Sequence, residues 1–144
     1  MAKRKSLHIK GMEHGAPIPN GVVIGNMVFS SAIGGKDAKT GVLSEDPDEQ
    51  AAAMFRNLEL FMEAAGGTSA NIAHIKVYLK DEKYRDNVNG PWEKMFPDEH
   101  DRPARHAIKV DLRGKNLFQI EYVWLTEIYP TYRLNDRWRP IEWG

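Results

Sequence analysis

The chain has 144 residues, of which 42% are hydrophobic, and this is enough to bury one core in one domain. Its 20 basic and 20 acidic residues cancel, so no net charge favours a nucleic acid or an anionic membrane as partner. The absence of cysteine excludes disulfides, thiolate nucleophiles, iron–sulfur clusters and cysteine-bound zinc.

The basic start, MAKRKS, is not followed by the apolar core of a signal peptide. No apolar run approaches the ~20 residues that cross a bilayer. We therefore expect a soluble, cytoplasmic protein.

Two strands joined by a tight turn are predicted in GVVIGNMVFSSAIGG, residues 21–35, where Gly-Asn separates two apolar runs. After a polar loop, Asp46 can cap a helix, Pro47 suits its first position and Glu49 can complete a capping box. Apolar residues then recur every three or four positions until a Gly-Gly pair at 66–67 ends the helix.

The second half of the chain predicts one more helix and three strands. Residues 72–79 alternate, which predicts a half-buried strand with Ile75, Val77 and Leu79 inward. The next segment fits a helix that Gly90-Pro91 should kink or split in two. Two final strands, RHAIKVDL and LFQIEYVWLTEI, are expected to be antiparallel neighbours.

The resulting order, ββαβαββ, predicts an α+β sandwich in which two helices pack on one face of a mixed sheet. The other face of the sheet is left bare, which favours oligomerisation. We assign residues 1–128 to this domain and 129–144 to an extension rich in aromatic residues. The extension is expected to pack as an arm on its own or a neighbouring subunit, or else to act as a substrate lid.

Most candidate sites lack the residue spacing or local context that their chemistry requires. The five histidines, His8, His14, His74, His100 and His106, lack the spacing of metal ligands, so no metal site is expected. Gly34-Gly35 does not open a helix and is interpreted as a turn rather than a phosphate loop. Ser30 and Ser31 lack the context of a nucleophile elbow.

Arg105 and Glu121 remain, each in a predicted strand. An arginine can bind a carboxylate through two parallel hydrogen bonds, and a nearby glutamate can orient or deprotonate a water. The pair therefore suits a site in which Arg105 binds a substrate carboxylate and Glu121 orients or deprotonates a water. An ordinary salt bridge between neighbouring strands explains the pattern equally, and spacing alone leaves both interpretations open.

Several linked segments resemble one family in consistent order over residues 17–127. They are SSAIGGKDAKTGVL, EQAAAMFRNLELFMEAAGG, IAHIKVYLKD, YRDNVNGPWEKMF and RPARHAIKV followed by FQIEYVW. They resemble the Rid group of reactive-intermediate deaminases, the YjgF-like proteins. The resemblance implies a chorismate-mutase-like fold and a homotrimer whose sheets form an inner barrel, with active sites in clefts between subunits. It also implies hydrolysis of 2-enamino or 2-imino acids to 2-oxo acids and ammonia, without a cofactor.

Carried over residue by residue, the resemblance makes Arg105 the group that binds the substrate carboxylate and Glu121 the group that positions water. It places Asn89, Ser31 and Ala32 beside the substrate.

The chain departs from the family pattern at three places. Ile18 stands where the best-known deaminases have a pocket tyrosine, and His106 and Ala107 replace a small residue and a cysteine. By alternation His106 points away from Arg105, as a packing or interface residue. His14 could add polar character to the cleft. These departures suggest a subgroup with its own substrate, such as a larger imino acid.

A competing interpretation is a noncatalytic trimer that binds a small carboxylate, or a proteostasis or ribonuclease-like regulator, since such roles are attributed to relatives. Arg105 alone would satisfy a binding protein. Retention of both Arg105 and Glu121 favours the deaminase.

Overall fold

The computed structural model describes residues 3–126, 131–134 and 137–140. In chain order the elements are β1 (Lys5–Leu7), β2 (Gly21–Ile24), β3 (Met27–Ser30), β4 (Ile33–Gly34), α1 (Pro47–Ala65), the 3-10 turn η1 (Ser69–Asn71), β5 (Ile72–Leu79), the 3-10 turn η2 (Glu82–Tyr84), α2 (Arg85–Met95), β6 (Ala104–Lys109), β7 (Phe118–Leu125), β8 (Thr131–Leu134) and β9 (Arg137–Pro140). Strands β8 and β9 pair with each other. The rest of the predicted extension lies outside the described residues, so its role as arm or lid stays a prediction.

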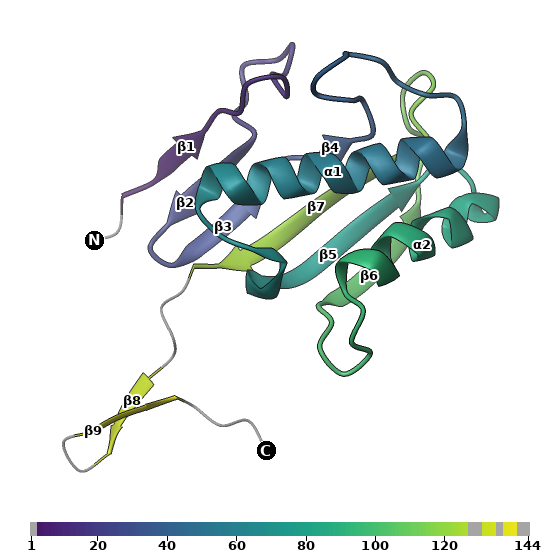
Figure 1. The fold of residues 1–144 in the computed structure, drawn as a ribbon. Helices are drawn as coiled ribbons and strands as arrows, with labels where there is room; N and C mark the ends of the chain where they lie inside the picture. Colours follow the sequence, from purple (N-terminus) through teal and green to yellow (C-terminus); the bar gives the residue numbers. More distant parts are fainter. Residues whose placement is uncertain (1–2, 127–130, 135–136, 141–144) are drawn as a thin grey trace.

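The main sheet has the strand order β1-β2-β3-β7-β5-β6, and β4 adds to β7. Its pairs are antiparallel except for β5 and β6, which run parallel. Helices α1 and α2 lie side by side across one face (Figure 1). The prediction of a mixed sheet with two helices on one face is confirmed.

The prediction that β6 and β7 are neighbours is wrong, because β5 lies between them. The reason is the helix α2 that connects β5 to β6. A strand, a crossover helix and a second strand form a parallel pair, so β6 joins one edge of β5. The other edge of β5 remains open, and β7 pairs with it.

Local signals set both ends of α1. The Asp46 carboxylate accepts a hydrogen bond from the Asp48 amide at 3.1 Å, as an N-cap should. The Glu49 carboxylate accepts from Arg56 at 2.9 Å and does not close the predicted capping box. Gly66 ends the helix in the left-handed conformation, with φ of 83°.

Helix α2 is one helix that continues through Pro91, so the predicted alternative of a helix split in two at Gly90-Pro91 is wrong. A proline removes one backbone hydrogen bond inside a helix and costs roughly 3 kcal/mol. Burial of Val88 and Trp92 against the sheet holds the helix together across this position. The change of helical form occurs earlier, where η2 passes into α2.

The core lies between the helices and the sheet. Ile75, Val77 and Leu79 are fully buried on the helix side of β5, as predicted. From β7, the Tyr122 ring contacts Phe61 of α1 edge to face at a centroid distance of 5.1 Å. No helix among the described residues combines the length and apolar character needed to cross a membrane.

Two glycines offer a test of this packing. A Cβ atom at Gly67 would overlap the buried ring of Trp124, whereas a Cβ at Gly90 in α2 would meet no atom within 4 Å. We expect Gly67→Ala to lower the free energy of unfolding by about 1–3 kcal/mol, because the core would be overpacked. We expect Gly90→Ala to raise it by about 0.5–1 kcal/mol through helix propensity. Urea denaturation measures both, and equal effects of the two variants would contradict the packing described.

Candidate functional site

Arg105 and Glu121 lie on opposite faces of the sheet. Arg105 is in register with Ile75, and Glu121 is in register with Lys76. Residues in register on neighbouring strands project to the same face, and adjacent residues project to opposite faces. Ile75 faces the helices, so Arg105 does too, while Glu121 points from the helix-free face. The predicted salt bridge between them is therefore excluded within one chain.

Arg105 is held by two neutral groups of α2. Its Nη2 donates a hydrogen bond to Oδ1 of Asn89 at 2.8 Å, and its guanidinium lies 4.9 Å from the ring centroid of Trp92. Among the described residues, Arg105 forms no ion pair with a carboxylate. Because an arginine has five N–H donors, most of them remain available to a ligand.

Burial lowers the pKa of the Arg105 guanidinium, and the positive charge of nearby Arg85 lowers it further. The side chain stays charged at any physiological pH, because an arginine begins from a very high pKa. A partly desolvated cation without an anionic partner is a favourable place for a carboxylate or a similar anion. We refer to Arg105, Asn89 and Trp92 as the arginine half-site.

Glu121 lies in a second group on the helix-free face. Its Oε1 accepts a hydrogen bond from the Tyr78 hydroxyl at 2.6 Å and lies 3.6 Å from Nζ of Lys76. A cavity of about 220 Å³ opens beside these groups, lined by Phe29, Ser30, His74, Lys76, Glu121, Tyr122 and Val123. We refer to Glu121, Tyr78 and Lys76 as the glutamate half-site.

The hydrogen bond to Glu121 raises the pKa of Tyr78 to about 12, with burial and the charge of Glu121 as smaller causes. Tyr78 is thus a hydroxyl donor at neutral pH. Sequence reasoning singled out neither Tyr78 nor Lys76. The alternation along β5 predicts the face on which Tyr78 and Lys76 lie. It does not predict that β7 is the strand that pairs with β5 beside them.

The remaining predicted residues gather at the N-terminal loop. His14 and Ile18 line a hollow of about 370 Å³ together with Ser6, His8, Glu13, Ala16, Pro17, Pro19 and Asn20. The Ser31 hydroxyl donates to the carbonyl of Pro19 at 2.7 Å, which ties the loop to the end of β3. Ala32 is exposed next to it. The structure therefore joins Ser31, Ile18 and His14, and separates them from the arginine half-site.

A buried asparagine fixes this loop. The Asn20 side chain accepts from the Ile9 amide at 2.7 Å and donates to the Met12 carbonyl at 2.5 Å. The loop is linked onward to the helix-free face, since Ser30, the neighbour of Ser31, accepts a hydrogen bond from the Tyr122 amide at 2.9 Å. The N-terminal hollow and the glutamate half-site are thus neighbours in one chain.

His106 is exposed and in register with Lys76. It projects from the helix-free face, so its predicted orientation away from Arg105 is confirmed.

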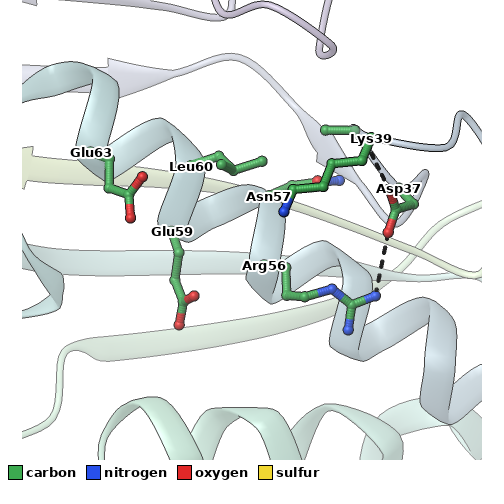
Figure 2. A pocket seen from close by; sticks show the side chains of 8 residues that line it. Asp37, Lys39, Arg56, Asn57, Glu59, Leu60 and Glu63 are labelled. Atoms are coloured by element: carbon green, nitrogen blue, oxygen red, sulfur yellow. Dashed lines mark hydrogen bonds and ion pairs between the residues drawn. The ribbon is translucent and has the colours of Figure 1, made fainter.

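A further hollow of about 350 Å³ lies beside α1 (Figure 2). We call it the α1 hollow. Its arginine, Arg56, donates to Glu49 at 2.9 Å and lies 3.7 Å from Asp37. The amide of its asparagine, Asn57, donates to two backbone carbonyls. These polar groups are occupied by internal partners, and no predicted site residue lines this hollow. In the part of the chain that the structure describes, no group of three or more His, Asp or Glu is placed to hold a metal ion.

Comparison with known proteins gives a consistent result. Residues 13–125 match the family described as Endoribonuclease L-PSP. The 2-iminobutanoate/2-iminopropanoate deaminase of Salmonella typhimurium is 35% identical over 96 residues, which are 65% of this chain and 74% of the relative. The deaminase of the same name from Escherichia coli is 33% identical with the same coverage.

Solved structures agree in fold. The yjgF gene product of Escherichia coli has a TM-score of 0.75 and 29% identity, covering 84% of this chain and 98% of that one. A putative endoribonuclease from Thermotoga maritima has a TM-score of 0.77 and 27% identity, covering 85% and 98% of the two chains.

The arginine half-site predicts that Arg105 contributes little to folding. In Arg105→Met the lost hydrogen bond and ring contact are offset by relief from desolvating a cation, so we expect the free energy of unfolding to change by less than about 1 kcal/mol. Trp92→Ala removes a buried ring and should cost about 3–5 kcal/mol. Denaturant titration of both variants tests this contrast. A loss above about 2 kcal/mol in Arg105→Met would instead indicate a structural role.

Proposed function

The chain belongs to the endoribonuclease L-PSP family, the Rid or YjgF-like proteins, and from this premise we propose that it hydrolyses 2-imino or 2-enamino acids to 2-oxo acids and ammonia. One observation carries the proposal. Arg105 is partly desolvated and oriented by neutral groups, and it forms no ion pair with a carboxylate in the described part of the chain. Such an arginine suits a ligand with a carboxylate, and the names of the deaminase relatives supply the class of acid.

We propose further that each active site is completed by two copies of the chain. A small acid bound at Arg105 cannot reach Glu121 of the same chain, because the sheet lies between them. A second copy can present its helix-free face to the arginine half-site of the first. This arrangement requires an oligomer in which the helix-free faces are covered.

The helix-free face carries the apolar surface that such an oligomer would bury. Met27, Phe29 and Leu125 on this face have exposed fractions of 37%, 37% and 42%. They are neighbours on β3 and β7. Large exposed side chains grouped in this way favour association. We propose a homotrimer in which the sheets form an inner barrel.

The reaction follows from these positions. Arg105, steadied by Asn89, binds the substrate carboxylate and fixes the imine carbon near Glu121 of the second copy. Glu121 accepts a proton from a water as the water oxygen bonds to the imine carbon. Glu121 returns its proton to the nitrogen, which gives a carbinolamine. The hydroxyl proton of the carbinolamine is then transferred to the nitrogen as the C–N bond breaks, so that ammonia leaves and the C=O bond of the 2-oxo acid forms. An imine carbon is already electrophilic, so positioning and charge supply the catalysis.

The N-terminal loop would shape the substrate pocket. Ile18 is 49% exposed and presents an apolar side chain where a tyrosine would offer a hydroxyl. With His14, Ser31 and Ala32 it would form the wall that receives the substrate side chain. We also propose that residues 1–128 form the catalytic domain and that 129–144 are an extension of it.

A carboxylate-binding protein without catalysis is the second candidate. The observation that favours it is that Arg105 and Asn89 form a carboxylate half-site without Glu121. It predicts binding of a 2-oxo acid or benzoate with no turnover of imines.

The function can be tested by generating 2-aminoacrylate in situ with a pyridoxal-phosphate dehydratase and following 2-oxo acid release. We expect wild-type protein to accelerate release. Arg105→Ala should lower kcat/KM about 10- to 100-fold or more, the equivalent of a lost charged hydrogen bond. Arg56→Ala is the matched control, because it removes an arginine from the α1 hollow, and it should retain full activity.

Loss of activity in Arg56→Ala but not in Arg105→Ala would move the site to the α1 hollow. No acceleration by wild type, together with binding of a 2-oxo acid that depends on Arg105, would establish the binding protein.

The oligomer has its own test. We expect light scattering to give the mass of three chains, and Phe29→Glu to reduce it because a charge would enter the covered face. Val42→Glu is the control, since Val42 is 60% exposed outside the strands. A wild-type monomer, or a Phe29→Glu protein that remains trimeric, would contradict the proposed interface.

A further inference from the structure

Glu121 is contacted by two donors at the same oxygen atom. The Tyr78 hydroxyl donates to Oε1 at 2.6 Å, and Nζ of Lys76 lies 3.6 Å from the same Oε1. Among the described residues, no hydrogen bond reaches Oε2. The carboxylate is therefore held on one side and open on the other.

We propose that Tyr78 and Lys76 are positioning residues, which fix Glu121 through Oε1 so that Oε2 is left to orient the attacking water. This inference rests on the proposed function and adds two residues to its site.

The sheet itself makes this arrangement. Lys76 of β5 is directly opposite Glu121 of β7, and Tyr78 lies two residues further along, opposite Gln119. Direct and diagonal partners on one face of an antiparallel pair are within reach of long and aromatic side chains. Both strands are central in the sheet and their opposite face is packed in the core, so the three side chains start from fixed backbone positions.

The chemistry of the two donors differs. A hydroxyl that bonds to a carboxylate at this distance forms a short, charge-assisted hydrogen bond, which is directional. Lys76 supplies a positive charge at longer range. In its ion pair with Glu121, the two side chains are 36% and 39% exposed. An exposed pair of this kind adds little to stability. Tyr78 therefore sets the orientation of the carboxylate, and Lys76 attracts the same oxygen through its charge at longer range.

The protonation states support this division of roles. Because the hydrogen bond to Glu121 raises the pKa of Tyr78 to about 12, the phenol keeps its proton below that pH and continues to donate. A carboxylate retains acceptor sites on its second oxygen when the first is engaged. The other titratable groups that face this site from the surrounding strands are His74 on β5 and His106 on β6.

The cavity beside Glu121 gives the free oxygen a place to act. Ser30 and His74 line it together with Lys76 and Glu121, and it measures about 220 Å³. This volume exceeds what one water occupies, which is about 30 Å³ in the liquid. A water and part of a small substrate can therefore share it.

Kinetics of the imine hydrolysis test the roles of both residues. Tyr78→Phe and Lys76→Met should each lower kcat about tenfold with KM changed less than about twofold, because water is misplaced while the carboxylate site is intact. Lys76→Arg should restore most of the rate.

Tyr84→Phe is the matched control for Tyr78→Phe. Tyr84 packs edge to face on Phe118, which places it on the helix side of the sheet, and the ring is retained in the variant. It should leave kcat and KM unchanged. An unchanged kcat in Tyr78→Phe, or an equal loss in Tyr84→Phe, would overturn the proposal.

A second measurement does not depend on activity. In protein labelled at the tyrosine Cζ, the Tyr78 carbon resonance, assigned by its loss in Tyr78→Phe, should report a protonated phenol up to about pH 11 in the wild type. In Glu121→Gln the same signal should titrate near pH 10, the ordinary value for tyrosine. Identical titration in both proteins would overturn the proposal. If Tyr78 depends on Glu121 but wild type hydrolyses no imine, the contact is supported and the deaminase function fails.

Discussion

The separation of Arg105 from Glu121 by the sheet is the constraint on which the account depends. The two side chains belong to strands on either side of β5, and their registers with Ile75 and Lys76 send them to opposite faces. One chain therefore carries two half-sites that cannot serve one small molecule together. In the proposed trimer, association of two copies would cover the exposed apolar side chains of the helix-free face. It would also bring Arg105 of one copy to Glu121 of another.

The two half-sites are prepared in different ways. Arg105 is steadied by an amide oxygen and an aromatic ring, so its charge remains available, whereas Arg56 beside α1 is bonded to carboxylates. Glu121, in contrast, has a hydroxyl and a cation as partners, and both contact the same carboxylate oxygen. A partly buried cation with no anionic partner among the described residues is a cost to the isolated fold, and binding of the proposed carboxylate ligand would offset that cost.

Local signals predicted much of the fold. The cap at Asp46, the glycine end of α1, the alternation in β5 and the direction of His106 depend only on nearby residues, and the structure confirms them. Strand order depends on which edge of β5 is free after the crossover through α2, and this is a tertiary choice. For that reason the neighbourhood of β6 and β7 was predicted wrongly, and Tyr78 and Lys76 were missed as partners of Glu121. The continuation of α2 through Pro91 also has a tertiary cause, because packing of Val88 and Trp92 overrides the local tendency of proline to end a helix.

Subunit complementation tests the central claim most directly. Arg105→Ala and Glu121→Gln proteins are each expected to be far less active than the wild type. The two would be co-expressed with different tags so that mixed oligomers can be purified. If each site of a trimer takes Arg105 from one copy and Glu121 from another, every mixed trimer contains one intact site out of three. Activity in the purified mixed oligomers at about a third of the wild-type value is the predicted result. Mixed oligomers as inactive as the parent variants would show that the two residues do not act across subunits.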